Sequence, residues 1–271
     1  MSEKSASKWS DLGIRTLSAV VLVPVVLGIV WQGGILFTGF AVTLGILIAI
    51  EWVKISFGGN KMQLLIHVLA AASLIMGSIK LSLLALVILT VLSMFVQRRD
   101  NPTFWKSVGV FYIGLPVLAL SLLREDADFG LKAVVWCMII VWSADVMAYF
   151  FGRIIGGPKL APRISPKKTW AGMLGAIVGA VVASTLFSDF AHISFWPLAG
   201  LAGLFAVLEQ GGDIFESAFK RHYGVKDSGS LIPGHGGVLD RVDGLIAVVL
   251  VAAIVGFVHN PLSSAAGLLH W

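Results

Sequence analysis

Charged residues are scarce in this chain, because Asp, Glu, Lys and Arg together make up 13% of its 271 residues. Soluble domains carry about 25% charged residues, so the composition excludes an ordinary water-soluble fold. The apolar content of 57% also indicates a chain that lies largely in lipid, so the composition predicts an integral membrane protein. The single cysteine, Cys137, lies inside an apolar run, which excludes a framework of disulfides.

The formal net charge is +5, from 20 Lys and Arg residues against 15 Asp and Glu residues. In a soluble domain such an excess would indicate a nucleic-acid partner. In a membrane protein the enrichment of Lys and Arg in cytoplasmic segments accounts for it. We therefore expect no nucleic acid among the partners.

Apolar runs need about 20 residues to cross the hydrocarbon core of a bilayer, which is roughly 30 Å thick. Nine runs approach this length, which predicts an all-α, polytopic membrane protein with about nine transmembrane helices. We expect five spans in an N-terminal region, residues 1–130, and four in a catalytic region, residues 131–271. The nine runs cover residues 14–31, 35–53, 62–79, 81–97, 104–123, 132–151, 170–188, 195–216 and 242–259.

Basic residues are distributed unevenly between the segments that connect these runs. With nine spans, alternate connections face opposite sides, and all but three of the 20 Lys and Arg residues fall on one set. The exceptions are Lys80, Arg124 and Lys132. The asymmetry predicts a cytoplasmic N-terminus. It also places two polar loops, residues 152–169 and 217–241, on the cytoplasmic side of the cell (inner) membrane, where we expect them to form the active site.

Acidic residues inside apolar runs are costly and typically functional. Near the end of the eighth run, Glu209, Asp213 and Glu216 are spaced by four and three residues, which places them on one face of a helix. Three like charges there require a bound metal ion or neighbouring Lys and Arg side chains. Asp145 in the sixth run and Asp243 at the start of the ninth are further acids beside the polar loops. For Asp145, a structural hydrogen bond is the alternative role.

Two other features have structural interpretations. Gly172, Gly175 and Gly179 in the seventh run predict close approach of helix backbones. Glu51, at the end of the second run beside Trp52, is expected at the membrane interface and outside the active site.

The first polar loop intersperses five cations with glycines and prolines, which preclude a regular helix. Rigid prolines between cationic side chains, such as Pro166 before Lys167 and Lys168, suit several phosphate groups at fixed positions. Attraction to anionic lipid at the membrane surface is the alternative interpretation.

The second polar loop offers Lys220, Arg221 and Lys226 for phosphates, followed by the sequence PGHGGVLDRVD. Its glycines can turn backbone N–H groups toward an anion, although the GxxxxGK[ST] pattern of a P-loop is absent. Oxygen ligands such as Asp213 and Asp240 favour Mg²⁺ over Zn²⁺. Cations, carboxylates and glycines at a membrane surface predict phosphoryl or nucleotidyl transfer onto a lipid.

The same region resembles the signature of the phosphatidate cytidylyltransferases, also called CDP-diacylglycerol synthases. The resemblance covers the C-terminal half closely, including WSADVMAYFFGR and KLAPRISPKKTWAG, and the N-terminal half only by hydropathy. Ala171 departs from the pattern, because many members carry Glu there, and we assign it no role. The signature positions are filled by Ser217, Lys220, Arg221, Lys226, Asp227, Gly229, Pro233, His235, Gly236, Gly237, Asp240, Arg241 and Asp243.

The resemblance implies a reaction of CTP with phosphatidate that gives CDP-diacylglycerol and pyrophosphate. It also implies Mg²⁺, with room for a second, monovalent cation such as K⁺, and a homodimer. The expected catalytic residues are Asp213, Asp240, Lys220, Arg221, Lys226 and Asp227. The expected substrate-binding residues are Lys167, Lys168, Ser217, His235, Gly236, Gly237 and Arg241. The expected metal ligands are Asp213, Asp240, Asp145, Asp243 and Glu209.

Two other functions remain open from the sequence. A CTP-dependent polyprenol kinase would also combine a nucleotide site with a lipid substrate. An anion transporter would also hold charges within the membrane, but it commonly shows inverted repeats and needs no long polar loop of fixed pattern.

Overall fold

The computed structural model describes residues 3–96, 104–232, 234 and 236–271. Within these residues the only strands form an antiparallel hairpin of β1 (Lys159–Ala161) and β2 (Ser165–Thr169). The helices are α1 (Glu3–Gln32), α2 (Gly34–Phe57), α3 (Lys61–Ala72), the 3₁₀ helix η1 (Ser73–Met76), α4 (Ile79–Val96), α5 (Phe104–Arg124), α6 (Gly130–Ile154), α7 (Trp170–Ala191), α8 (Phe195–His222), α9 (Leu239–His259) and α10 (Ser264–Leu269).

Six of the described helices, α2, α4, α6, α7, α8 and α9, are long and apolar enough to cross a membrane. Three shorter apolar segments occur at Val20–Gln32, Lys61–Met76 and Val108–Arg124. Large apolar side chains such as Leu186 and Phe190 are exposed on the outer faces of the helices, as contact with lipid requires. The chain is therefore a helical, multi-pass membrane protein, as predicted. The number of nine spans remains a prediction, because the three shorter segments fall below the length of the six helices.

Local sequence explains where the elements near the polar segments begin and end. Gly58 terminates α2 with a left-handed φ of 59°. The side chain of Asn60 then accepts hydrogen bonds from the backbone N–H groups of Met62 and Gln63 and starts α3. Thr169, the last residue of β2, accepts a hydrogen bond from the N–H of Gly172 at 3.0 Å and caps α7. The β1–β2 hairpin is therefore joined to α7 without a linker.

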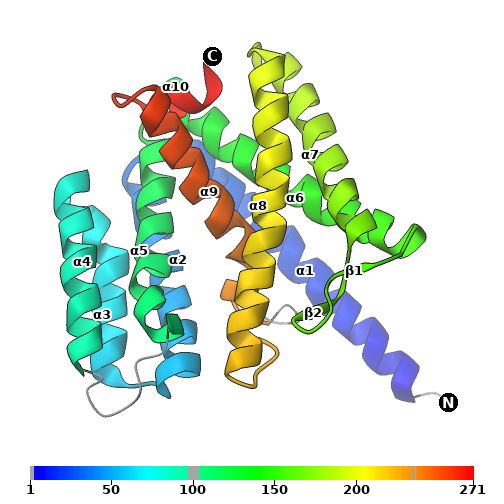
Figure 1. Cartoon of the computed structure of the whole chain (residues 1–271), viewed down its shortest axis with the longest axis horizontal. Coiled ribbons are helices and arrows are strands. Elements are labelled where there is room, and N and C mark those ends of the chain that lie inside the picture. The colour runs from blue at the N-terminus through cyan, green and yellow to red at the C-terminus, as the bar shows by residue number, and fades with distance from the viewer. Residues whose placement is uncertain (1–2, 97–103, 233, 235) are drawn as a thin grey trace.

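Helices α8 and α9 occupy the centre of the bundle, with α3, α4 and α5 on one side and α6 and α7 on the other (Figure 1). One apolar core lies among α6 to α9 and includes Trp136 and Phe205. A second core joins α2, α5, α8 and α9. In this core Trp52 stacks on Phe219 with 3.9 Å between ring centroids, which fixes the rotation of α8 relative to α2. The hairpin and the connection from α8 to α9 lie at one end of the bundle, and the C-terminus lies at the other.

The glycines of α7 face α6. A Cβ atom on Gly175 would lie 2.7 Å from the carbonyl oxygen of Met147 and 2.6 Å from Cβ of Phe151. A Cβ atom on Gly179 would lie 2.9 Å from the carbonyl oxygen of Ser143. This close approach of the two backbones confirms the predicted packing role.

Gly175→Ala is expected to destabilise the protein by about 1–3 kcal/mol, because the new methyl group meets backbone that cannot move aside. That change lowers the thermal midpoint by roughly 2–4 °C per kcal/mol in a chain of this size. Thermal unfolding in detergent measures the effect. The matched control is Gly200→Ala in α8, where a Cβ atom meets nothing within 4 Å. Equal midpoints for the two variants would contradict the packing role.

The predicted loops, residues 152–169 and 217–241, require a correction at their ends. Helix α8 continues to His222 because its last turns still bury Phe219 and Lys220, so Ser217 and Arg221 are helical. Helix α9 begins at Leu239 and therefore includes Asp240 and Arg241. Only residues 223–238 of the second loop lie between the two helices. In the first loop, residues 152–154 belong to α6, and residues 159–161 and 165–169 pair as strands.

Candidate active site

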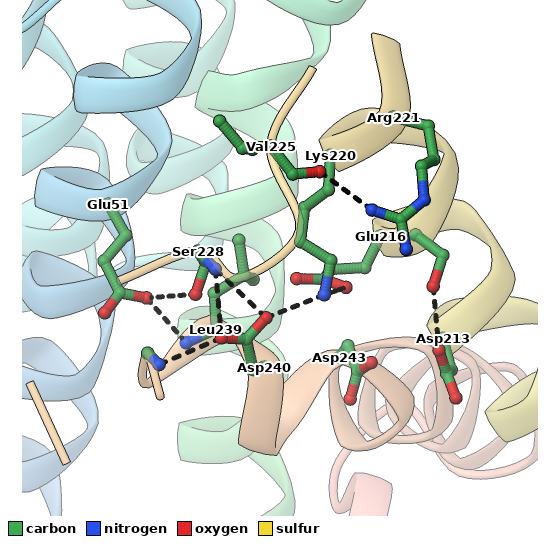
Figure 2. Close-up of polar contacts among 12 residues, drawn as sticks. Glu51, Asp213, Glu216, Lys220, Arg221, Val225, Ser228, Leu239, Asp240 and Asp243 are labelled. Atoms are coloured by element: carbon green, nitrogen blue, oxygen red, sulfur yellow. Dashed lines mark hydrogen bonds and ion pairs between the residues drawn. The ribbon is translucent and has the colours of Figure 1, made fainter. Parts of the chain in front are cut away.

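Three carboxylates from α8 and α9 form an acidic trio, defined by Asp213, Glu216 and Asp243. Each offers one oxygen atom, and these atoms lie within 4.8 Å of one another. Figure 2 shows Asp243 on α9 close to Asp213 on α8. The sequence predicts Asp213 and Asp243 as metal ligands; it also places Glu216 on the same helix face as Asp213, but without assigning it as a ligand.

Glu216 is the most deeply buried member of the trio, with 0% of its surface exposed. Its Oε2 atom is ion-paired with Lys220, and its Oε1 atom has no hydrogen-bond partner among the described residues. A buried carboxylate oxygen without a partner is unfavourable unless a cation approaches it. Three carboxylates at this separation are the donors that hard divalent cations prefer, so the trio fits a metal ion.

Lys220 balances part of the negative charge between the two helices. It is 9% exposed, and its Nζ atom lies 2.7 Å from Oδ1 of Asp240 as well as against Glu216. A buried lysine between two carboxylates is held in one position by both. It can therefore present fixed positive charge beside the trio.

The hairpin docks on α8 through Lys168. Its Nζ atom lies 2.7 Å from Oδ2 of Asp213 and donates to Oε1 of Gln210 at 2.9 Å. The Gln210 side chain in turn donates to Oε2 of Glu209 at 2.8 Å. Lys168 thus lies beside the acidic trio, while Lys167 is exposed on β2, and their predicted contact with substrate stays a prediction.

Asp145 on α6 and Glu209 on α8 form a second acidic pair whose carboxyl groups lie close enough to interact. Two adjacent carboxylates repel each other unless a proton or a cation reduces their charge. Lys168 and Arg241 lie close enough to Asp145 to reduce the repulsion. Both acids are predicted metal ligands, and the structure places them outside the trio.

Asp240 holds the connection between α8 and α9. Its Oδ1 atom accepts from Nζ of Lys220 at 2.7 Å, and its Oδ2 atom accepts from the N–H groups of Ser228 and Gly237 at 3.0 and 2.9 Å. Figure 2 shows these bonds converging on the start of α9. In the structure Asp240 lies outside the trio and binds the backbone of the connection between α8 and α9. Its role as a metal ligand therefore stays a prediction.

Glu51 is the residue that the sequence analysis misplaces. The expectation that it lies outside the active site is wrong, because it is 2% exposed and accepts hydrogen bonds from Ser228, Val238 and Leu239. The residues next to Glu51 in the sequence are those of an ordinary acid near a helix end, so they do not indicate a role in the active site. No signal in the sequence links it to the distant connection, where a Cβ atom on Gly237 would lie 2.7 Å from each carboxylate oxygen of Glu51.

The remaining predicted site residues surround this core. Ser217 donates to Oδ1 of Asp213 at 3.2 Å, and Arg221 donates to the carbonyl oxygen of Val225 at 2.9 Å. Gly236 forms an isolated bridge with Ile232 at a φ of 91°, a conformation that favours glycine. Lys226, Asp227 and Arg241 are exposed, and His235 lies outside the described residues.

Comparisons with known proteins match most of the chain, including the residues of this site. The model of the cytidylyltransferase family matches residues 13–259. A protein of Brucella abortus biovar 1 (strain 9-941) named phosphatidate cytidylyltransferase is 40% identical over 255 residues, which cover 91% of this chain and 94% of the relative. A protein of the same name from Staphylococcus haemolyticus (strain JCSC1435) is 33% identical over 251 residues, covering 87% of this chain and 95% of the relative.

Proposed function

The chain belongs to the cytidylyltransferase family, and from this premise we infer that it is a phosphatidate cytidylyltransferase, which converts CTP and phosphatidate to CDP-diacylglycerol and pyrophosphate. The observation that carries this function is the acidic trio with Lys220 and Lys168 beside it, at one end of a bundle of apolar helices. Such a site lets a nucleotide from water meet the phosphate group of a lipid that stays in the bilayer.

In the reaction, an oxygen of the phosphatidate phosphate bonds to the α-phosphorus of CTP. The bond from that phosphorus to the oxygen bridging to the β-phosphate breaks, and pyrophosphate leaves with the electron pair. Both reactants are anions near neutral pH, so the attacking oxygen needs little help from a general base. Repulsion between the two anions is the larger barrier, and the fixed charges of Lys220 and Lys168 reduce it.

We assign Mg²⁺ to Asp213, Glu216 and Asp243. When bound, the ion neutralises triphosphate charge and stabilises the leaving pyrophosphate. We assign a second, monovalent cation such as K⁺ to the pair of Asp145 and Glu209, because a cation there would offset the repulsion between the two carboxylates.

The exposed cations around the trio complete the proposed substrate site. Lys167, Arg221, Lys226 and Arg241 are available to the phosphates of CTP. We place this end of the bundle at the cytoplasmic face of the cell membrane, because CTP is cytosolic and the basic connections favour that side. The homodimer is an expectation from the resemblance alone.

The test uses purified protein in mixed micelles with phosphatidate, Mg²⁺ and CTP labelled in one of two positions. We expect label from the α-phosphate to enter the lipid, and label from the γ-phosphate to appear in pyrophosphate. With a polyprenol in place of phosphatidate we expect no labelled lipid. Entry of the γ-label into a lipid would identify a CTP-dependent kinase instead, and a folded protein that labels no lipid would reject both enzymes.

A further inference from the structure

Glu51 lies in the N-terminal half of the chain, yet its partners belong to the active-site connection. Its Oε2 atom accepts hydrogen bonds from Oγ of Ser228 and from the N–H of Leu239, each at 2.9 Å. Its Oε1 atom accepts from the N–H of Val238, also at 2.9 Å. Figure 2 shows the carboxylate pointing from α2 toward Ser228 and Leu239. One side chain thus holds both the connection and the first turn of α9.

The charge of Glu51 is stabilised by backbone groups. Within the described residues, no Lys, Arg or His side chain is ion-paired with Glu51. Two of its three donors are N–H groups at the start of α9, where the helix dipole is positive and N–H groups lack partners within the helix. A carboxylate suits this place because its oxygens only accept hydrogen bonds, whereas an amide would set an NH₂ group against an N–H donor.

The chain around Glu51 is shaped by two glycines. A Cβ atom on Gly229 would lie 2.6 Å from Oε1 of Glu51, and a Cβ atom on Gly237 would lie 2.7 Å from both carboxylate oxygens. The backbone N–H groups of Ser228 and Gly237 donate to Oδ2 of Asp240, on the opposite side of the connection from Glu51. The same short connection is therefore held between two carboxylates, one from α2 and one from α9.

We propose that Glu51 is a positioning residue of the active site: it fixes Ser228, Val238 and Leu239, so that Asp240 meets Lys220 and Asp243 meets the carboxylates of α8. The proposal rests on the proposed function, since it concerns the alignment of that site. It assigns the N-terminal half of the chain a direct part in the geometry of the C-terminal site.

The test compares Glu51→Gln and Ser228→Ala with the matched control Gln63→Met. Gln63 is also buried, and its side chain makes two hydrogen bonds with Ser93 that join α3 to α4. Three quantities are measured for each protein in mixed micelles: the thermal midpoint, kcat and KM for CTP, and amide hydrogen exchange in residues 224–232 and 236–242.

Glu51→Gln is expected to lower kcat at least about 10-fold at saturating CTP, because misplacement of reacting groups by about 1 Å has effects of this size or larger. Amide exchange in residues 224–232 and 236–242 is expected to accelerate in the same variant. Ser228→Ala removes one of the three bonds, so we expect a smaller loss of about 2- to 5-fold. Gln63→Met is expected to lower the thermal midpoint while kcat and the exchange of both segments stay as in wild type.

Wild-type kcat in Glu51→Gln would overturn the proposal. A loss of kcat without faster exchange would also overturn it. If Glu51→Gln fails to fold, Ser228→Ala decides, and unchanged exchange in that variant rejects the positioning role. Faster exchange in Glu51→Gln, in a protein whose wild type makes no CDP-diacylglycerol, would retain the positioning role and reject the proposed function.

Discussion

Asp243→Asn is expected to lower kcat/KM for CDP-diacylglycerol formation by at least about 10²-fold. The change keeps the size of the side chain but removes one of the three charges that gather at the trio with Asp213 and Glu216. Weaker metal binding should appear first as a higher Mg²⁺ concentration for half-maximal rate. Initial rates over a range of Mg²⁺ concentrations measure both quantities.

The matched control for this prediction is Asp189→Asn, an exposed acid at the end of α7. We expect it to match the wild type in rate and in Mg²⁺ dependence. Because Asp243 is partly buried among like charges, the Asn variant is expected to keep or raise the thermal midpoint. A folded Asp243→Asn protein with more than a third of wild-type activity would remove the trio from the mechanism.

Lys220→Met is expected to abolish detectable activity and to lower stability together. Its loss leaves Glu216 and Asp240 without the cation that joins them, and breaking a buried ion pair in this way costs about 3–5 kcal/mol. For a chain of this size we expect the thermal midpoint to fall by roughly 10 °C. Lys61→Met, which alters an exposed lysine at the start of α3, is the control and should change neither quantity.

A second substitution separates the two effects of Lys220. The double variant Lys220→Met with Glu216→Gln no longer buries the unpaired charge of Glu216, so we expect it to regain part of the lost thermal midpoint. We expect no recovery of activity, because the positive charge beside the substrate phosphates is still missing. A Lys220→Met protein with the wild-type midpoint would show that this ion pair is not important for the fold.

Hydropathy was sufficient to predict a helical membrane protein, because apolar runs of this length have few alternatives to a helix in lipid. It was insufficient for the ends of α8 and α9. Polar residues such as Lys220 and Asp240 continue these helices because their charges pair across the helix interface instead of reaching water. A local pattern contains no information about that partner.

The candidate site shows the same limit. The spacing of Asp213 and Glu216 places them on one face of α8, but their meeting with Asp243 depends on how α9 crosses α8. Glu51 was misplaced because its donors are 177 to 188 residues away in sequence. For Asp240, the motif predicts a catalytic metal ligand, which stays a prediction, while its hydrogen bonds to the connection are visible only in three dimensions.

The distance in sequence between Glu51 and Leu239 has a consequence for biogenesis. Chains are synthesised from the N-terminus, so α2 emerges and inserts while the 188 positions up to Leu239 have yet to be completed. Until Ser228 is made, the acid of α2 has none of its final donors, and the two backbone donors follow only at Val238 and Leu239. The start of α9 therefore completes this site late in synthesis, and a nascent chain that stops before Val238 lacks two of the three donors to Glu51.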